Sequence, residues 1–179
     1  MLENYKMTQE IINECWRSID GFINYQVSNI GRVRNCNTGR ILKGCVNIHG
    51  YSNVVLCQNG KKHNYKIHRL VAREFLDNPN NKKCVDHINH NKTDNHVWNL
   101  RWCSHSDNNR NVTKQQNTSS MYLGVSWHKL KNKWICRVRD ENSKLKHLGY
   151  FEIEKDAALA YNKYVSANFP EFGQLNQID

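Results

Sequence analysis

The chain has 179 residues and a mass of 21.1 kDa, which is room for one ordinary domain or for two to three small modules. With 39% hydrophobic residues, two prolines, no apolar run near the roughly 20 residues of a membrane span and no basic-then-apolar leader, a disordered, membrane-embedded or secreted protein is not expected. Its 26 lysines and arginines against 16 acidic residues give a net charge of +10, which favours a polyanionic partner, most simply nucleic acid.

The first predicted segment, residues 1–60, combines a short helix with a small antiparallel sheet. Thr8 is placed to cap a helix that extends to Cys15. Turn signals such as Asp20-Gly21 then separate short runs that are typical of strands joined by tight turns. These predicted strands are residues 25–28, 32–34 and 51–57.

The second predicted segment, residues 61–113, begins with a hairpin at Asn59-Gly60 and continues as a helix from Ile67, which Asn78-Pro79 stops. His68 lies at the start of this helix, where a structural role is expected. Beyond the helix, the pattern predicts two strands separated by a polar loop, and then a helix capped by Ser104. These elements are the strands 85–88 and 99–103, the loop 89–96 and the helix 106–113.

The third predicted segment, residues 120–179, follows a polar linker at 114–119 and consists of three strands and one helix. The strands are predicted at 124–127, 134–139 and 146–151, and the helix at 154–167. Strand alternation places Trp134, Cys136 and Val138 against the helix and Ile135, Arg137 and Arg139 on the outward face. The whole chain is therefore predicted to be an α+β protein made of small modules, with short antiparallel sheets.

The seven cysteines predict neither a disulfide framework nor structural zinc. Their number is odd, and no C-x2-C or C-x4-C pair occurs, so the usual spacing of a tetrahedral zinc site is missing. Several stand in apolar runs, which is typical of reduced cysteines packed as small hydrophobic residues in an intracellular protein.

The densest chemical cluster is Asp86-His87, with Asn99 and Asn108 further along the chain. If the predicted strands and helix form, a carboxylate and an amide oxygen converge on one cation, and a few hard oxygen ligands suit Mg²⁺. His87 beside that ion is placed to take a proton from water, since imidazole titrates near neutrality. These groups are sufficient for metal-assisted hydrolysis of a DNA strand.

The residues around this cluster resemble the HNH homing endonucleases of phage and intron type. The resemblance implies a ββα-metal site with one divalent ion, Mg²⁺ or Mn²⁺, held by Asp86 and Asn108, with His87 as general base. Asn99 would brace the loop that presents His87. His90 departs from the glycine or aspartate that is frequent in that loop. The stretches that carry the resemblance are Ile67-His68-Arg69-Leu70-Val71-Ala72, Val85-Asp86-His87-Ile88-Asn89, Asn91-Lys92-Thr93-Asp94-Asn95 and Asn99-Leu100-Arg101-Trp102.

Two further residues of this segment are candidates for meeting the scissile phosphate. His105 stands one helical turn before Asn108, on the same predicted helix face. Arg101 carries a permanent positive charge on the second predicted strand. Both are assigned to the catalytic region by the same resemblance, with Arg101 as a DNA contact.

The flanking segments resemble other modules. Trp16-Arg17-Ser18-Ile19-Asp20-Gly21-Phe22 and the run from Tyr25 to Val33 are similar to the nuclease-associated modular motif that often precedes such sites. Residues 122–176 resemble the DNA-binding domain of plant APETALA and ethylene-response factors, which lays a three-stranded sheet in the major groove. The matching residues are Gly124-Val125-Ser126-Trp127, Lys133-Trp134, His147-Leu148-Gly149-Tyr150-Phe151, Ala157-Ala158-Leu159-Ala160-Tyr161 and Leu175-Asn176.

The sequence therefore predicts a site-specific DNA endonuclease of the homing type, acting as a monomer on an extended site in double-stranded DNA. A virus or phage gene is compatible with the resemblance. A catalytically silent DNA-binding regulator with the same fold is the alternative, and a colicin-like non-specific nuclease is less favoured because it needs no appended modules. The predicted DNA contacts of the third segment are Ser126, His128, Arg137, Arg139, Lys146 and His147.

Overall fold

The computed structural model describes residues 13–111 and 118–178. These residues form two compact units, divided between Ser104 and His105, each of which is described by itself. The helix predicted from Thr8 lies almost wholly outside the described residues, and most of the linker predicted at 114–119 does so as well.

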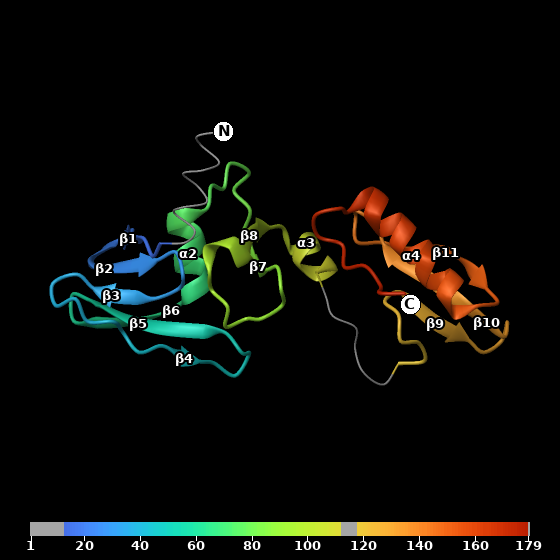
Figure 1. Cartoon of the computed structure of the whole chain (residues 1–179), viewed down its shortest axis with the longest axis horizontal. Helices are drawn as coiled ribbons and strands as arrows, with labels where there is room; N and C mark the ends of the chain where they lie inside the picture. Colours follow the sequence, from blue (N-terminus) through green and yellow to red (C-terminus); the bar gives the residue numbers. More distant parts are fainter. Residues whose placement is uncertain (1–12, 112–117, 179) are drawn as a thin grey trace. The chain divides into compact units, whose positions relative to one another are not determined.

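The first unit begins with two small three-stranded sheets (Figure 1). All neighbouring strands in them are antiparallel, as expected for strands joined by tight turns. The sequence pattern did not predict β1 or β4, and both are short edge strands. The strands are β1 (Trp16–Ile19), β2 (Phe22–Ser28) and β3 (Val33–Asn35) in one sheet, and β4 (Cys45–Val46), β5 (Ser52–Gln58) and β6 (Lys61–Lys66) in the other.

A helix and a third, two-stranded sheet complete the first unit. Helix α2 (Ile67–Phe75) follows β6 directly and buries Leu70, Val71 and Ala72. It ends at Phe75, because Leu76 is already extended, shortly before the predicted stop at Asn78-Pro79. The remaining elements are β7 (Cys84–His87), the 3-10 turn η1 (Val97–Asn99) and β8 (Leu100–Cys103).

One hydrophobic core serves all of these elements. It combines residues of the first two sheets with residues of α2, β7 and β8, so apolar packing is continuous across residue 60. The division of the chain at that point into two modules stays a prediction, whereas the core is common to both sides of it. The core residues are Ile19, Phe22, Tyr25, Val27, Val33, Val54, Leu56, Ile67, Leu70, Val71, Ala72, Val85 and Leu100.

The second unit contains a three-stranded antiparallel sheet covered on one face by a helix (Figure 1). Its three strands and single covering helix agree with the predicted pattern, with boundaries that differ by at most one residue, and the strand order is β11-β10-β9. The elements are α3 (His105–Arg110), β9 (Val125–His128), β10 (Lys133–Arg139), β11 (Leu145–Phe151) and α4 (Glu154–Asn168). The core residues are Tyr122, Val125, Cys136, Val138, Ala157, Ala158, Tyr161 and Val165.

The predicted α+β class with small antiparallel sheets is thus confirmed. One prediction about the third segment is wrong, because Ile135 is only 5% exposed although it alternates with the exposed Arg137 and Arg139. Ile135 lies in the central strand directly opposite Tyr150, whose side chain shares its face. Among the residues that the structure describes, no helix is long and apolar enough to cross a membrane.

Candidate active site

The two strands of the predicted nuclease cluster pair as an antiparallel hairpin, β7 with β8. Asp86 lies opposite Arg101, and His87 lies opposite Leu100. Asp86 and His87 stand at the carboxyl end of β7 and are 6% and 5% exposed. Because burying an ionisable group is costly unless it is paired or neutral, the partners of these two side chains determine the chemistry of the site.

Arg101 is the ion-pair partner of Asp86. Its Nε and Nη2 donate hydrogen bonds of 2.9 and 2.8 Å to Oδ2 of Asp86. The guanidinium therefore compensates the buried carboxylate, which offsets part of the cost of keeping it charged. The sequence assigned Arg101 a contact with DNA, which stays a prediction, but did not foresee this ion pair.

Asn95 holds the imidazole of His87. Nε2 of His87 lies 3.3 Å from Oδ1 of Asn95. An amide oxygen only accepts hydrogen bonds, so this contact requires the tautomer in which Nε2 carries the proton. Nδ1 is then the nitrogen with the lone pair, and it is the atom that can accept a proton from water.

The surroundings of His87 favour its neutral form. Burial lowers its pKa below the usual 6.5, and the nearby charge of Lys92 lowers it further. The hydrogen bond with Asn95 and the negative charges of Asp86 and Asp94 oppose this shift without reversing it. At neutral pH the side chain is therefore an unprotonated base, which is the form that general-base catalysis needs.

Two aromatic rings line the other side of His87. The ring of His68, at the start of α2, lies 4.8 Å from that of His87 at an angle of 71°. The ring of Tyr51, which directly precedes β5, lies 5.0 Å from His68 and 6.0 Å from His87. Burial lowers the pKa of His68 to about 3, so His68 is neutral as well and adds no charge beside the base.

Asn99 fastens the loop that follows His87. Its Oδ1 accepts a 3.0 Å hydrogen bond from the backbone N–H of Asn89. Its Nδ2 donates to Oδ1 of Asn89 at 2.9 Å and to the carbonyl oxygen of Asp94 at 2.8 Å. One buried amide thus ties both ends of the loop to the start of β8, which limits how far His87 can move.

His90 occupies the position of this loop where the resembled family often has glycine. Its φ of +63° lies in the left-handed region, which residues with a Cβ seldom adopt. The backbone N–H of His90 donates a 3.0 Å hydrogen bond to the carbonyl oxygen of His87, which closes the turn. The turn geometry therefore explains a preference for glycine at this position.

The second candidate metal ligand, Asn108, belongs to the other unit. Asn108 and His105 lie on α3, which clusters with the second unit, whereas Asp86 and His87 lie in the first. The assignment of Asn108 as a ligand and of His105 as a phosphate contact stays a prediction. Within residues 13–111 and 118–178, no three His, Cys, Asp or Glu side chains gather in a way that could hold a metal ion.

The donor chemistry present nevertheless fits a divalent ion of the magnesium type. Such ions take few protein ligands, prefer carboxylate and amide oxygens, and keep several waters. The predicted ligand pair consists of these two donor types, the carboxylate of Asp86 at the end of β7 and the amide of Asn108 on α3, and their binding of one common ion stays a prediction.

The outward face of the second unit carries five of the six predicted DNA contacts of the third segment. Arg137 lies opposite His147, and Ile135 lies opposite Ser126, on the face that alternates away from Cys136 and Val138. His128 and His147 lie 5.3 and 4.6 Å from the ring of Tyr150. Arg139 is exposed as well, and its Nη1 donates a 2.9 Å hydrogen bond to the carbonyl oxygen of Ser143. Exposed basic side chains on one sheet face are suited to phosphate and base-edge contacts.

Lys146 lies apart from this group. A β-bulge between Cys136 and Arg137 shifts the register, so that Lys146 is opposite the buried Val138. Its ammonium lies 4.9 Å from the ring centroid of Tyr164, on α4. The structure therefore gives Lys146 a helix-facing position, unlike the outward position expected from simple alternation.

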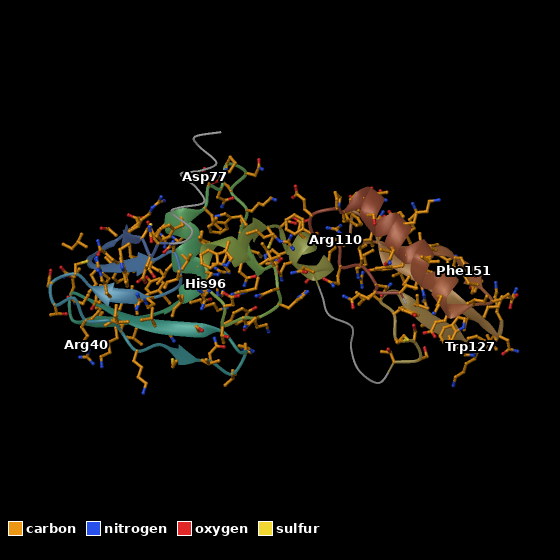
Figure 2. All side chains as sticks on the ribbon, viewed as in Figure 1. Arg40, Asp77, His96, Arg110, Trp127 and Phe151 are labelled. Carbon is orange, nitrogen blue, oxygen red and sulfur yellow. The ribbon has the colours of Figure 1, made fainter. Side chains whose placement is uncertain are left out.

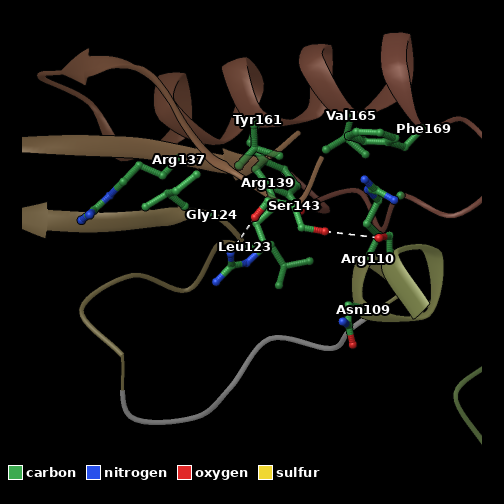
Figure 3. Close-up of a pocket in the computed structure, with 14 residues that line it drawn as sticks. Asn109, Arg110, Leu123, Gly124, Arg137, Arg139, Ser143, Tyr161, Val165 and Phe169 are labelled. Carbon is green, nitrogen blue, oxygen red and sulfur yellow. Dashed lines mark hydrogen bonds between the residues drawn. The ribbon is translucent and has the colours of Figure 1, made fainter. Parts of the chain in front are cut away.

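A pocket of about 510 Å³ lies in the second unit, between α3, one edge of β10 and the end of α4 (Figure 3). Arg110 of α3 reaches across it, donating a 2.7 Å hydrogen bond to the carbonyl oxygen of Asp140 and lying 4.0 Å over the ring of Phe169. Figure 2 shows Arg110 within the second unit, together with the partly exposed Trp127 at the sheet. These contacts attach α3 to the rest of its unit.

Asn95 and Tyr51 are the site residues that sequence reasoning missed. Asn95 stands in a loop rich in polar residues, where no spacing rule separates a partner of His87 from a solvated side chain. Tyr51 comes from the first predicted segment, more than thirty residues before the nuclease cluster. The contact of its ring with His68 results from the continuous core, which brings β5 and α2 together.

Comparisons with known proteins match both parts of the first unit. A model of the NUMOD4 motif matches residues 14–57, and a model of the HNH endonuclease family matches residues 65–110. Two HNH endonucleases of Acanthamoeba polyphaga mimivirus are 39% and 46% identical over 93 and 101 residues. The DNA endonuclease I-HmuI of Bacillus phage SP01 is 37% identical over 97 residues.

These matches cover 52 to 54% of this chain, but they span only 28%, 25% and 56% of the respective relatives. A solved structure of DNA binding and cleavage by the HNH homing endonuclease I-HmuI aligns with a TM-score of 0.52 and 30% identity, over 74% of this chain and 76% of that one. The relatives thus come from a giant virus and a phage. On these similarities, the chain belongs to the HNH endonuclease family, with a NUMOD4 motif ahead of its HNH domain and homology to I-HmuI.

Proposed function

We propose that this protein is a site-specific DNA endonuclease of the HNH homing type, which hydrolyses a phosphodiester bond with one divalent metal ion and His87 as general base. The observation that carries the proposal is the environment of His87. Its imidazole is buried, neutral by its pKa, hydrogen-bonded through Nε2 and adjacent to the carboxylate of Asp86. The homology to a DNA endonuclease supports the same function.

In this proposal, Nδ1 of His87 takes a proton from the attacking water molecule, while Asn95 keeps the ring in the required tautomer and orientation. Asp86 and Asn108 would hold the metal ion, for which Mg²⁺ or Mn²⁺ is expected. When bound there, the ion would stabilise the negative charge that develops on the phosphate and the departing oxygen. Arg101 compensates the Asp86 carboxylate when no ion does so.

The remaining predicted residues support the reaction without taking the proton. Asn99 restrains the loop that carries His87, through its hydrogen bonds to Asn89 and Asp94. His105 would contact the scissile phosphate from α3, since an imidazolium or a neutral imidazole N–H can donate to a phosphate oxygen.

We further propose that the second unit binds the target. Its three-stranded sheet with one covering helix is the arrangement expected from the APETALA-like resemblance, and its outward face carries Arg137, Arg139 and His147. With the nuclease and the NUMOD4 motif in the same chain, a monomer would contact double-stranded DNA over an extended site.

A supercoiled-plasmid assay tests the enzymatic part of the proposal. The wild-type protein is expected to nick the plasmid with Mg²⁺ and not with EDTA, and His87→Ala is expected to lose nicking by about 100-fold or more. His63→Ala is the matched control, because His63 is an exposed histidine on β6. Equal nicking by His87→Ala and His63→Ala would contradict the role of His87.

A catalytically silent DNA-binding regulator is the second candidate. The ion pair of Arg101 with Asp86 favours it, because the guanidinium occupies an oxygen of the carboxylate that a metal would use. The same plasmid assay separates the two functions. DNA binding without metal-dependent nicking by the wild-type protein would identify the regulator.

A further inference from the structure

Two lysine side chains pack against one aromatic ring in the first unit. Tyr51 directly precedes β5, and its ring centroid lies 4.5 Å from Nζ of Lys66 and 4.9 Å from Nζ of Lys92. Lys66 is the last residue of β6, and Lys92 stands in the loop between β7 and β8. Three separate segments therefore converge to place two positive charges on one ring.

The turn that presents Tyr51 is held in one conformation. Oδ1 of Asn47 accepts hydrogen bonds from the backbone N–H groups of His49 and Tyr51, at 2.9 and 3.1 Å. Nζ of Lys92 donates a 3.2 Å hydrogen bond to the carbonyl oxygen of His49. A Cβ at Gly50, whose φ is +82°, would lie 3.7 Å from Cδ of Lys92, so the lysine stem packs along this turn.

The lysine pair, Lys66 and Lys92, has no compensating acidic partner. Among the described residues, neither ammonium lies within ion-pair distance of a carboxylate. Two like charges on one ring repel each other, and the attraction of each to the π face offsets only part of that repulsion. An anion shared by the two ammonium groups would turn the repulsion into attraction.

The lysine pair also adjoins the candidate active site. The Tyr51 ring between the lysines lies 6.0 Å from the His87 ring. The charge of Lys92 acts on His87, and that of Lys66 acts on His68. An anion held by the lysine pair would therefore lie beside the general base, in a protein whose net charge is +10.

We propose that Lys66 and Lys92, held on the ring of Tyr51, bind one backbone phosphate of the DNA strand next to the phosphate that His87 acts on. This inference rests on the proposed function and adds to it a residue from the NUMOD4 match, since Tyr51 falls within residues 14–57 and His87 within 65–110. The NUMOD4 motif then helps to position the strand at the cut, in addition to any role in finding the target.

The test is the salt dependence of DNA binding, measured by fluorescence anisotropy with a labelled duplex of mixed sequence in EDTA. The slope of log affinity against log salt is negative. Lys66→Gln with Lys92→Gln should make it less steep by about 0.9, which corresponds to the loss of one phosphate contact. Lys61→Gln with Lys62→Gln removes the same charge from the exposed, opposite end of β6 and should change the slope less. Lys66→Arg with Lys92→Arg should keep the wild-type slope.

Equal slopes for the two glutamine pairs, or a wild-type slope for Lys66→Gln with Lys92→Gln, would overturn the inference. Lys92→Gln alone is the control for a folding defect, because Lys92 is an exposed loop residue. The salt dependence of this single variant should shift in the same direction as that of the double variant. Binding is measured without metal, so it does not depend on cleavage. If the lysine variants show the expected slope change but the wild-type protein never nicks DNA, the proposed enzyme activity is contradicted and the phosphate contact is supported.

Discussion

The β7–β8 hairpin of the first unit and the three-stranded sheet of the second unit use polar residues in opposite ways. In the hairpin, Asp86 and His87 are buried, and each has a hydrogen-bonding partner on a neighbouring strand or loop. On the sheet, Arg137 and Arg139 are exposed. Proton transfer requires a fixed tautomer and a shifted pKa, which burial provides, whereas phosphate contact requires a charge that water and DNA can reach.

The strongest test of this contrast removes the candidate metal ligands. Asp86→Ala and Asn108→Ala are each expected to lower the nicking rate by about 100-fold or more while DNA affinity is largely retained. Nicking of supercoiled plasmid and duplex binding in EDTA measure the two quantities separately. Asn109→Ala, which changes the neighbouring residue on α3, should cut normally. Normal cutting by either ligand variant would show that the ligand assignment is wrong.

A second change tests whether Asn95 fixes His87. Asn95→Leu removes the acceptor and should lower the nicking rate by about 10-fold, because the ring loses its orientation. Asn95→Asp keeps an acceptor but adds a negative charge, which raises the pKa of His87. Since the base works only when unprotonated, the acid limb of the rate–pH profile should lie below pH 6.5 for the wild type and shift to higher pH in Asn95→Asp. Superimposable profiles would remove Asn95 from this role.

Replacing the exposed arginines tests whether the sheet of the second unit contacts DNA. Arg137→Ala with Arg139→Ala should weaken DNA binding and flatten its salt dependence, by about 0.9 in slope for each phosphate that the variant no longer binds. Lys146→Gln removes a charge from the helix-facing side of the same sheet and should leave the slope unchanged. If all of these variants bind like the wild type across salt concentrations, the second unit does not contact DNA.

The smallest expected effect concerns the acid stability of the first unit. Burial lowers the pKa of His68 to about 3, so its neutral form stabilises the fold above pH 6.5 and this contribution is lost as the pH falls toward 3. His68→Phe cannot take up a proton and should reduce the loss of stability between pH 7 and pH 5, on the order of 1 kcal/mol. Thermal melting at both pH values measures it, and His63→Phe, which replaces an exposed histidine, is the matched control.

Much of the fold could be predicted from the sequence because its signals are local. The alternation of residues 134–139 and the apolar stripe of the last helix gave β10 and α4 to within two residues. Ile135 was expected to face outward but is buried beside its cross-strand neighbour Tyr150, and a β-bulge places Lys146 on the helix-facing side instead of the outward one. Both depend on pairing between strands, which a single strand's pattern does not contain.

In the candidate site, too, the residues of a local motif could be predicted, whereas contacts between distant segments could not. Asp86, His87 and Asn99 stand close together in the chain and carry a recognisable motif, so they could be chosen from the sequence. The ion pair of Arg101 with Asp86 follows from strand register, and the contact of Tyr51 with His68 follows from the tertiary packing of β5 near α2. Neither could be predicted from spacing along the chain.

The shared core of the first unit limits how this nuclease can be transplanted. A fragment starting at residue 61 would leave behind Ile19, Val27 and Leu56, which are buried against α2 and its neighbours. It would expose their apolar partners to water and would lose Tyr51, whose ring stands beside the imidazole of His87. An engineer who wishes to fuse the proposed cutting activity to a foreign DNA-binding domain should therefore keep the first unit whole, from residue 13 onward, and not begin the fusion at residue 61.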